Sequence, residues 1–276
     1  MQTAKPTCPL CHTDNPDRLH TYTQPPVGET RFPFSTNEDY QRRLYACRTC
    51  GHMRSVHDFD LEGFYQDAYG AATYGNEGIQ AAFRKILALP ARESDNAGRV
   101  KRLVEFNAQY NRGLLTSPTV LDVGSGLCVF LYGITQAGWQ GTAVEPDRGM
   151  ADHARNYVKI DAVCASFMEF KTDRKHDFIT FNKVLEHVID PVQMLHKSHQ
   201  HLDDGGCVYL ELPDAEAAWR AGPGREEFFI EHYHIFSLAS ACLLARKAGF
   251  EALVIERLQE PSSKYTIRLF ITPQRS

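Results

Sequence analysis

From residue 118 to the end of the chain, short apolar runs alternate with longer stretches of helical periodicity. The apolar runs are TVLDVG, GTAVEP, DAVCAS, DFITFNKV, CVYLEL, FEALVIERL and YTIRLFITP. Between them, apolar residues recur at helix spacing near 128–138, 148–156, 191–202 and 237–248. Strands that alternate with helices form a mostly parallel sheet with helices on both faces. The pattern therefore predicts an α/β fold with a doubly wound, seven-stranded, mostly parallel sheet.

The end of this sheet is expected to differ from the rest. Only QEPSSK separates the last two apolar runs, which leaves no room for a crossover helix. Two strands joined by so short a loop pair as an antiparallel hairpin. We therefore expect a C-terminal antiparallel hairpin at one edge of the sheet.

The chain before residue 118 divides into two further parts. Residues 1–70 are rich in Cys, Pro, His and aromatic residues and show no long helical period. Residues 71–117 hold two helical stretches, IQAAFRKILALP and NAGRVKRLVEFNAQYNRG. In the second, Val100, Leu103 and Val104 share one face, and Gly113 is a plausible end. We expect a small N-terminal segment (1–70), a helical connector or lid (71–117) and the α/β domain (118–276).

Composition and charge narrow the function classes. The 276 residues carry a formal net charge of −4, and the pI is about 6.3. Proteins that mainly bind nucleic acid usually have a basic pI and clustered Lys and Arg residues, so the charge of this chain argues against that class. No run approaches ~18 apolar residues, and the N-terminus lacks the apolar core of a signal peptide. We expect a cytoplasmic protein with no membrane span.

Four of the eight cysteines form two tight pairs, CPLC (Cys8 and Cys11) and CRTCGH (Cys47 and Cys50), 35 residues apart. In a reducing cytosol, such pairs indicate metal ligands rather than disulfides. Four thiolates suit a tetrahedral zinc site, and His12 or His52 is an alternative ligand for one of them. Four protein ligands leave no open position, so the zinc is expected to be structural. The remaining four cysteines are isolated and are expected to be small buried hydrophobes.

The stretch VLDVGSGLC (120–128) places two glycines after the first strand of the α/β domain. A dinucleotide-binding loop would have a third glycine three residues after Gly126, where Val129 stands. A methyl-donor loop often has one at the position of Cys128. Glu145 ends the second strand, about twenty residues after the loop, where a carboxylate can accept both hydroxyls of a ribose. These features are shared by NAD sites and S-adenosylmethionine sites.

Asp122 and the terminal hairpin favour the second of these cofactors. A carboxylate at the end of the first strand would sit poorly against a pyrophosphate, whereas it suits the cationic, amino-acid-bearing end of S-adenosylmethionine. The antiparallel hairpin is likewise typical of methyltransferases rather than dehydrogenases.

Four motifs in order resemble the class I S-adenosylmethionine-dependent methyltransferases: VLDVGSG, AVEPD, FNKVLEHVIDPVQMLHKSHQHLDDGG and EHYHIFSLASACLLARKAGFE. The sequence is most similar to the subgroup with an N-terminal zinc-binding segment, which acts on sugars and small metabolites. The resemblance covers residues 118–272, and 1–70 in outline. Cys128 departs from it, at a position that is often glycine. The chain also ends where sugar C-methyltransferases of this subgroup continue, so C-methyl transfer is not implied.

The resemblance implies a donor site at the ends of the first two strands. It places Asp122, Gly124 and Gly126 around the methionine and ribose portions. It assigns the ribose hydroxyls to Glu145, with Pro146 and Asp147 beside it.

At the third and fourth strand ends, the resemblance implies four further residues. Ser166 and Phe167 would flank the adenine, although core packing is an equal alternative for the phenylalanine. Asn182 and Lys183 would lie under the sulfonium.

Candidate proton acceptors for the methyl acceptor are His187 in VLEHV and the cluster Glu231, His232 and His234 in IEHYHIFS. Histidine suits this task because its unperturbed pKa is about 6.5. In an extended backbone, His232 and His234 would share one side. The alternative for His187 is a hydrogen bond that anchors its loop. The histidine of the subgroup's EHxxxFS pattern corresponds to His232.

Three functions remain open. The first is a methyltransferase for a small molecule, such as a nucleotide-linked sugar, with the zinc segment and the aromatic stretch Phe64–Tyr74 covering the acceptor. The second is an RNA methyltransferase, since residues 84–112 carry seven Lys/Arg against three acids. A solvated helix face is the simpler interpretation of that run. The third is a non-catalytic zinc-ribbon scaffold with a degenerate cofactor fold. The acidic balance of the chain favours the first.

Overall fold

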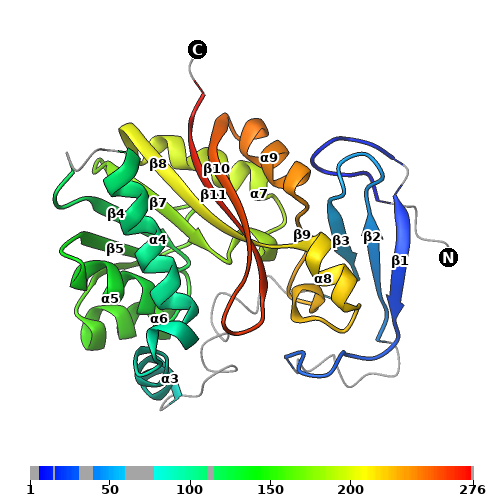
Figure 1. The fold of residues 1–276 in the computed structure, drawn as a ribbon, viewed down its shortest axis with the longest axis horizontal. Coiled ribbons are helices and arrows are strands. Elements are labelled where there is room, and N and C mark those ends of the chain that lie inside the picture. Colours follow the sequence, from blue (N-terminus) through cyan, green and yellow to red (C-terminus); the bar gives the residue numbers. More distant parts are fainter. Residues whose placement is uncertain (1–5, 15, 31–39, 60–77, 111–114, 275–276) are drawn as a thin grey trace.

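In the computed structural model the described residues are 6–14, 16–30, 40–59, 78–110 and 115–274, and a seven-stranded sheet forms the larger part of the fold (Figure 1). Its spatial order is β10-β11-β8-β7-β4-β5-β6. Its strands are β4 (Thr119–Val123), β5 (Gln140–Glu145), β6 (Asp161–Cys164), β7 (His176–Asn182), β8 (Leu202–Pro213), β10 (Phe250–Gln259) and β11 (Tyr265–Pro273). The pairs from β8 to β6 are parallel, while β11 is antiparallel to β8 and β10 to β11. The predicted doubly wound sheet and its C-terminal hairpin are confirmed.

Helices cover both faces of this sheet and produce two separate apolar cores. The covering helices are α4 (Asp95–Tyr110), α5 (Val129–Gln136), α6 (Arg148–His153), α7 (Pro191–Lys197) and α9 (Leu238–Lys247). Val120 of β4 belongs to the core with α4 and α5, and the next residue, Leu121, belongs to the core with α7 and α9. Because neighbouring strand residues face opposite sides, near-continuous apolar runs are what two covered faces require.

The connector consists of α3 (Gly78–Leu87), the short η2 (Ala91–Glu93) and α4. Leu103 of α4 is fully buried, and Val100 and Val104 pack against the same core, as the helical period predicts. In α3, Ile79 packs with Leu127 and Met150, so this helix lies against the loop after β4 and against α6. Gly113 lies outside the described residues.

Three regions differ from the expected pattern. After α6 the chain continues as a π-helical turn, η3 (Ala154–Val158), and η5 (Ser198–Gln200) follows α7. The helix α8 (Ala215–Ala221) was not expected from the sequence. It begins because the side chain of Asp214 accepts the backbone N–H groups of Glu216 and Ala217, at 3.0 and 3.1 Å. The remaining short helices are η4 (Leu185–His187) and η6 (Glu226–Phe228).

A second sheet stands at one end of the molecule, beside α8 (Figure 1). It is antiparallel and has the order β1 (Asp17–Tyr22), β2 (Arg42–Ala46), β3 (Met53–Val56) and β9 (His234–Ile235). The last of these strands belongs to the α/β part of the chain. It joins the sheet through the pairs Met53 with Ile235 and Arg54 with His234. The N-terminal segment is thus joined to the main domain through a shared sheet.

Within the described ranges, no helix is long and apolar enough to cross a membrane.

Candidate functional site

The loop after β4 has the backbone that its glycines allow. Gly124 has φ +67°, and a Cβ there would lie 2.9 Å from Cγ2 of Val184. Gly126 has φ +50°, and a Cβ there would meet nothing within 4 Å. The first glycine is therefore required by a close neighbour and the second leaves one face of the loop open. An open loop face beyond a strand's carboxyl end is where ligands bind in doubly wound sheets.

Cys128 stands where methyl-donor loops often have a third glycine. Its backbone is left-handed, with φ 60° and ψ 17°, and its side chain is fully buried in the core with α4 and α5. The thiol therefore points away from the open face of the loop. The cysteine keeps the backbone shape that a glycine would give, at the cost of a strained conformation.

Glu145, at the end of β5, is tied to the glycine loop. Its Oε2 accepts the backbone N–H of Gly126 at 2.8 Å, and its Oε1 accepts that of Asp147 at 2.9 Å. Burial raises the pKa of Glu145 to about 7, although these two N–H groups act against the rise. The side chain of Asp147 in turn caps α6 by accepting the N–H of Met150 at 3.0 Å.

Asp122, in β4, forms a hydrogen-bonded group with β7. Its Oδ1 accepts the hydroxyl of Thr180 at 2.6 Å and the side-chain amide N–H of Asn182 at 2.8 Å. Burial raises its pKa to about 6, and both of these bonds oppose the rise. The Oδ1 of Asn182 is buried and has no partner among the described residues. This acceptor is available to a donor group of a ligand.

The other strand-end residues are placed differently. Phe167 is buried in the core, where its ring meets Phe181 edge-on at 5.6 Å, so its contacts are those of a packing residue. Ser166 accepts the N–H of Met168 at its Oγ, 3.3 Å away. The carbonyl of Pro146 accepts the thiol of Cys164 at 3.7 Å.

Lys183 follows β7 with φ 61°. Its Nζ donates to Oγ1 of Thr266 at 2.6 Å, which directs the ammonium toward β11. Burial lowers its pKa.

Beyond β7, His187 and His232 face one another. Their ring centroids are 4.8 Å apart, in an edge-on arrangement. The Nδ1–H of His187 donates to the carbonyl of Glu231, and that of His232 donates to the carbonyl of Glu227, both at 2.9 Å. Because a carbonyl only accepts, these bonds fix the tautomer, and each neutral ring carries its lone pair on Nε2. Burial lowers the pKa of His187 to about 4 and that of His232 also below its ordinary value.

His234 belongs to a different group. Residues 230–232 turn rather than extend, so His234 does not share a side with His232. Its Nδ1 lies 3.0 Å from Nε2 of His52, and its Nε2 lies 3.2 Å from the carbonyl of Ile189. With both ring nitrogens engaged, His234 links β3 to the loop after η4 instead of offering a base.

Two buried carboxyls border the histidine pair. Glu186 is fully buried, and neither of its carboxylate oxygens has a hydrogen-bond partner in the described part of the chain. Burial raises its pKa to about 7, against the attraction of Lys183. Glu231 also has a pKa raised by burial to about 7. Glu186 directly precedes His187 in the LEH motif but is not among the site residues predicted from the sequence.

A buried ion pair holds the segment before Glu231. Arg42 of β2 pairs with Glu29 at 3.0 Å and also donates to the carbonyl of Phe228. Glu29 accepts the backbone N–H of Ile230 at 2.7 Å through the same oxygen, Oε2. The N-terminal sheet thereby fixes the turn that leads to His232.

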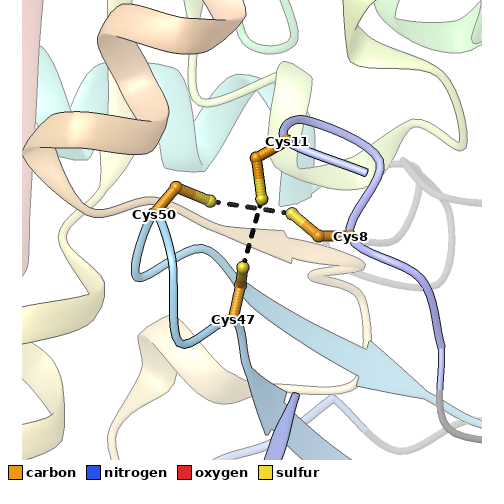
Figure 2. A group of neighbouring side chains, drawn as sticks. All are labelled: Cys8, Cys11, Cys47 and Cys50. Carbon is orange, nitrogen blue, oxygen red and sulfur yellow. Dashed lines mark hydrogen bonds between the residues drawn. The ribbon is translucent and has the colours of Figure 1, made fainter. Parts of the chain in front are cut away.

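The four paired cysteines converge on one point (Figure 2). The Sγ atoms of Cys8 and Cys50 are 3.6 Å apart, and those of Cys11 and Cys47 are 3.3 Å apart. Four thiolates around Zn²⁺ at about 2.3 Å would stand about 3.8 Å from one another, so the arrangement needs little adjustment to fit. The thiol of Cys50 lowers the pKa of Cys8 to about 4 by stabilising its thiolate.

The two alternative histidine ligands lie elsewhere. Among the described residues, the group that could hold an ion here contains the four cysteines only. His12 contacts Lys247 at 2.7 Å, and His52 contacts His234. Ser237 donates its hydroxyl to the carbonyl of Cys50, which ties the second knuckle to the start of α9.

A family model described as a methyltransferase domain matches residues 90–255, more than half of the chain. The chain belongs to this methyltransferase family. The resemblance to class I methyltransferases and the expected fold are thereby confirmed, and the order of the seven strands agrees with both.

Curated relatives of this methyltransferase chain match over part of their length. One is a cypemycin N-terminal methyltransferase from a Streptomyces species, 27% identical over 115 residues, which are 39% of this chain and 47% of the relative. Another is a ubiquinone biosynthesis O-methyltransferase from Pseudomonas paraeruginosa, 26% identical over 142 residues, 47% of this chain and 61% of the relative. The match thus spans about half to three fifths of each relative.

Solved structures share the fold of the methyltransferase chain. The 1,6-didemethyltoxoflavin-N1-methyltransferase of Burkholderia thailandensis aligns with a TM-score of 0.55 at 17% identity, over 90% of this chain and 100% of its own. The magnesium protoporphyrin IX methyltransferase of Synechocystis aligns with a TM-score of 0.56 at 14% identity, over 73% of this chain and 97% of its own. Both structures contain S-adenosylhomocysteine.

Proposed function

We propose that this protein transfers a methyl group from S-adenosylmethionine to a small-molecule acceptor, a sugar or a related secondary metabolite. The observation that carries the proposal is the junction of Glu145 with Gly126, which sets a carboxylate against an open glycine loop in a chain of the methyltransferase family. In the cofactor, the methyl group sits on a positive sulfonium, so its transfer is an in-line displacement.

The donor would lie across the carboxyl ends of β4 to β7. Glu145 would accept the ribose hydroxyls, while Asp122 and the open Oδ1 of Asn182 would receive the cationic amino-acid end. Gly124 and Gly126 would allow the close approach, with Pro146, Ser166 and Lys183 at the borders. Phe167 would support the adenine pocket from the core rather than line it.

The acceptor would bind between the donor's methyl group and the face that carries His187 and His232. Positioning accounts for much of the barrier in such a transfer, and a proton acceptor assists a hydroxyl nucleophile. The lone pairs on Nε2 of both rings can accept that proton, and Glu231 supplies a further carboxyl next to His232. The stretch Phe64–Tyr74, expected to cover the acceptor, lies outside the described residues.

The basic run of residues 84–112 supports a small acceptor over RNA. Arg99 pairs with Glu211, Arg102 with Glu256, and Lys101 with Glu105. These cations are therefore compensated within the protein, and the first two are turned toward the large sheet. A surface that grips RNA would instead present uncompensated cations to the phosphates. We propose a nucleotide-linked sugar as the acceptor to test first.

Calorimetry with S-adenosylhomocysteine and, separately, with NAD tests the donor assignment. We expect the first to bind and the second not to. Labelled S-adenosylmethionine then tests the acceptor, through methyl transfer to nucleotide sugars or to RNA added in parallel. NAD binding without S-adenosylhomocysteine binding would refute the donor assignment. Label in the RNA fraction alone would refute the small-molecule acceptor.

We also propose that Cys8, Cys11, Cys47 and Cys50 hold one structural Zn²⁺ and that residues 1–70, 71–117 and 118–276 form the three functional parts of the chain. Metal analysis of protein purified without added metal should give one zinc for these thiols. Cys47→Ser should lose it together with N-terminal order, measured by limited proteolysis. Cys164→Ser is the matched control, because Cys164 lies outside the cluster and is exposed; the expectation that the isolated cysteines are buried holds for Cys128 and Cys207 and is wrong for Cys164 and Cys242. A Cys47→Ser protein that resists proteolysis as the wild type does would contradict the structural role.

A further inference from the structure

Glu186, His187 and His232 bring three metal-ligating groups together at a place separate from the cysteine cluster. One ligand atom from each lies within 4.8 Å of the others. Glu186 and His187 belong to the single turn of η4, directly after β7, while His232 approaches from the segment before β9. Two short hydrogen bonds close this junction: Tyr233 donates its N–H to the carbonyl of Glu186, and His187 donates to the carbonyl of Glu231.

The carboxylate of Glu186 is the observation that points to a cation. It is completely buried, and both oxygens lack a hydrogen-bond donor within the described ranges. Within the same ranges Glu186 forms no ion pair: the Lys183 ammonium attracts it, but its short hydrogen bond goes to Thr266. A buried carboxylate without hydrogen-bond donors is unfavourable in its charged form, and a bound metal ion would stabilise that form.

The two imidazoles are prepared for the same role. In each, Nδ1–H donates to a backbone carbonyl, which fixes the ring and leaves the lone pair on Nε2. Metal-ligating histidines almost always make this second hydrogen bond, because it orients the ring and sets its tautomer. Two histidines and one carboxylate are a ligand set for divalent first-row metals, with positions left open for other ligands.

We propose that Glu186, His187 and His232 form a second metal site, which takes a divalent first-row transition ion and keeps open positions on the acceptor side. The role of the ion rests on the proposed function and replaces one part of it: with Nε2 of both histidines bound to the ion, water rather than a histidine takes the proton of the acceptor. An acceptor hydroxyl bound at an open position loses its proton to water more readily, because the cation stabilises the alkoxide. The alkoxide oxygen then forms the new bond to the methyl carbon, the carbon–sulfur bond breaks, and sulfur keeps the electron pair. Acceptors with two adjacent oxygens, such as a vicinal diol, fit such a site best.

Cobalt(II) alone is a suitable probe, because thiolate ligands give an intense charge-transfer band and nitrogen–oxygen ligands do not. The full chain is first dialysed against a chelator mild enough to leave the zinc of the cysteine cluster in place. We expect one equivalent of Co²⁺ to bind without the thiolate band. Glu186→Gln and His232→Gln should each weaken this binding at least about 100-fold, since loss of a residue that only hydrogen-bonds to a metal ligand already costs about 10–100-fold.

Glu231→Gln is the matched control, because Glu231 also has a buried oxygen without a partner but lies outside the ligand group. It should bind Co²⁺ as the wild type does. Calorimetry with S-adenosylhomocysteine serves as the folding control for each variant. It also tests the proposed function separately, because cobalt binding does not require the methyl donor. Cobalt uptake that shows only the thiolate band, no uptake at all, or equal uptake by the Glu186→Gln protein would overturn the second site.

Discussion

The backbone N–H of Gly126 donates to the carboxylate of Glu145 across 2.8 Å, which joins the ends of the neighbouring strands β4 and β5. One carboxylate thus shapes the glycine loop and, in the proposed donor site, would also accept the ribose hydroxyls. The same burial that places it there raises its pKa to about 7, and the pKa of Asp122 to about 6. The protonation of the donor site therefore changes within the range in which enzymes are normally assayed.

Donor affinity and stability should respond to pH in opposite directions. In the proposed donor site the ionised form of Glu145 would accept two ribose hydroxyls, so affinity for S-adenosylhomocysteine should rise as pH increases through about 6 to 7. Because its pKa in the folded protein lies above the unfolded value of 4.5, its contribution to stability is fully present below that value. That contribution is lost as pH rises through about 7. Calorimetry and urea unfolding across this range measure the two effects.

Glu145→Gln should remove the changes of donor affinity and of stability near pH 7. Asp122→Asn should remove the change of donor affinity near pH 6. Glu145→Ala should weaken donor binding by about 1–3 kcal/mol, because buried hydroxyls lose a charged partner. An affinity profile that stays unchanged in the Glu145→Gln protein would show that this carboxylate does not meet the ribose.

Cys128 should invert the usual order of Ala and Gly substitutions. Its left-handed backbone costs an L-residue about 1–2 kcal/mol, which alanine retains and glycine relieves. We therefore expect Cys128→Gly to be more stable than Cys128→Ala, although both lose a buried sulfur. Urea unfolding of the two variants measures the difference. A more stable alanine variant would mean that the φ of 60° carries no strain.

The ion pair of Arg42 and Glu29 should be worth far more than an exposed pair. Arg42→Met leaves Glu29 buried without its cation and should cost about 3–5 kcal/mol of unfolding free energy. Arg48→Met is the control, since Arg48 pairs with Asp17 at the surface and should cost at most about 1 kcal/mol. Equal costs in denaturant titrations would show that the buried pair does not anchor the segment before His232.

The facing histidines should control turnover but not donor binding. Changing His187 or His232 to alanine should lower turnover about 10²–10⁴-fold, the usual size of a proton-transfer contribution. Affinity for S-adenosylhomocysteine should stay nearly constant. His196→Ala is the control, because His196 on α7 also bonds a carbonyl, that of Ala248, but away from this face. Full turnover in both the His187→Ala and the His232→Ala proteins would show that neither histidine is the proton acceptor.

The large sheet follows from the sequence because its strands are buried on both faces and therefore appear as continuous apolar runs. The same pattern locates the residues proposed for the donor site, because Asp122, Glu145 and Asn182 lie at or near the ends of those runs. The left-handed backbone after the two glycines belongs to the loop itself. That a cysteine takes this conformation at position 128 could not be predicted from the neighbouring residues.

Features that depend on distant contacts could not be predicted in the same way. Strand β9 has two residues, too few for any periodicity, and forms only because β3 lies beside it. Nothing in the sequence distinguishes Glu186 from a surface glutamate. Its burial without hydrogen-bond donors results from the packing of the segment around Tyr233 against η4. The spacing in EHYH predicted a shared side for two histidines, but the turn before His234 sends it to His52 instead.

The pairing of β3 with β9 also has a consequence for the order of events during synthesis. Chains emerge from the ribosome N-terminus first, and domains tend to fold as they appear. Strands β1 to β3 leave early, yet their sheet lacks its fourth strand until His234 and Ile235 have been made. During that interval, capture of zinc by the four thiols would hold the early strands together. Strands β1 to β3, although they are translated before the large sheet, would then be among the last parts of this fold to be completed.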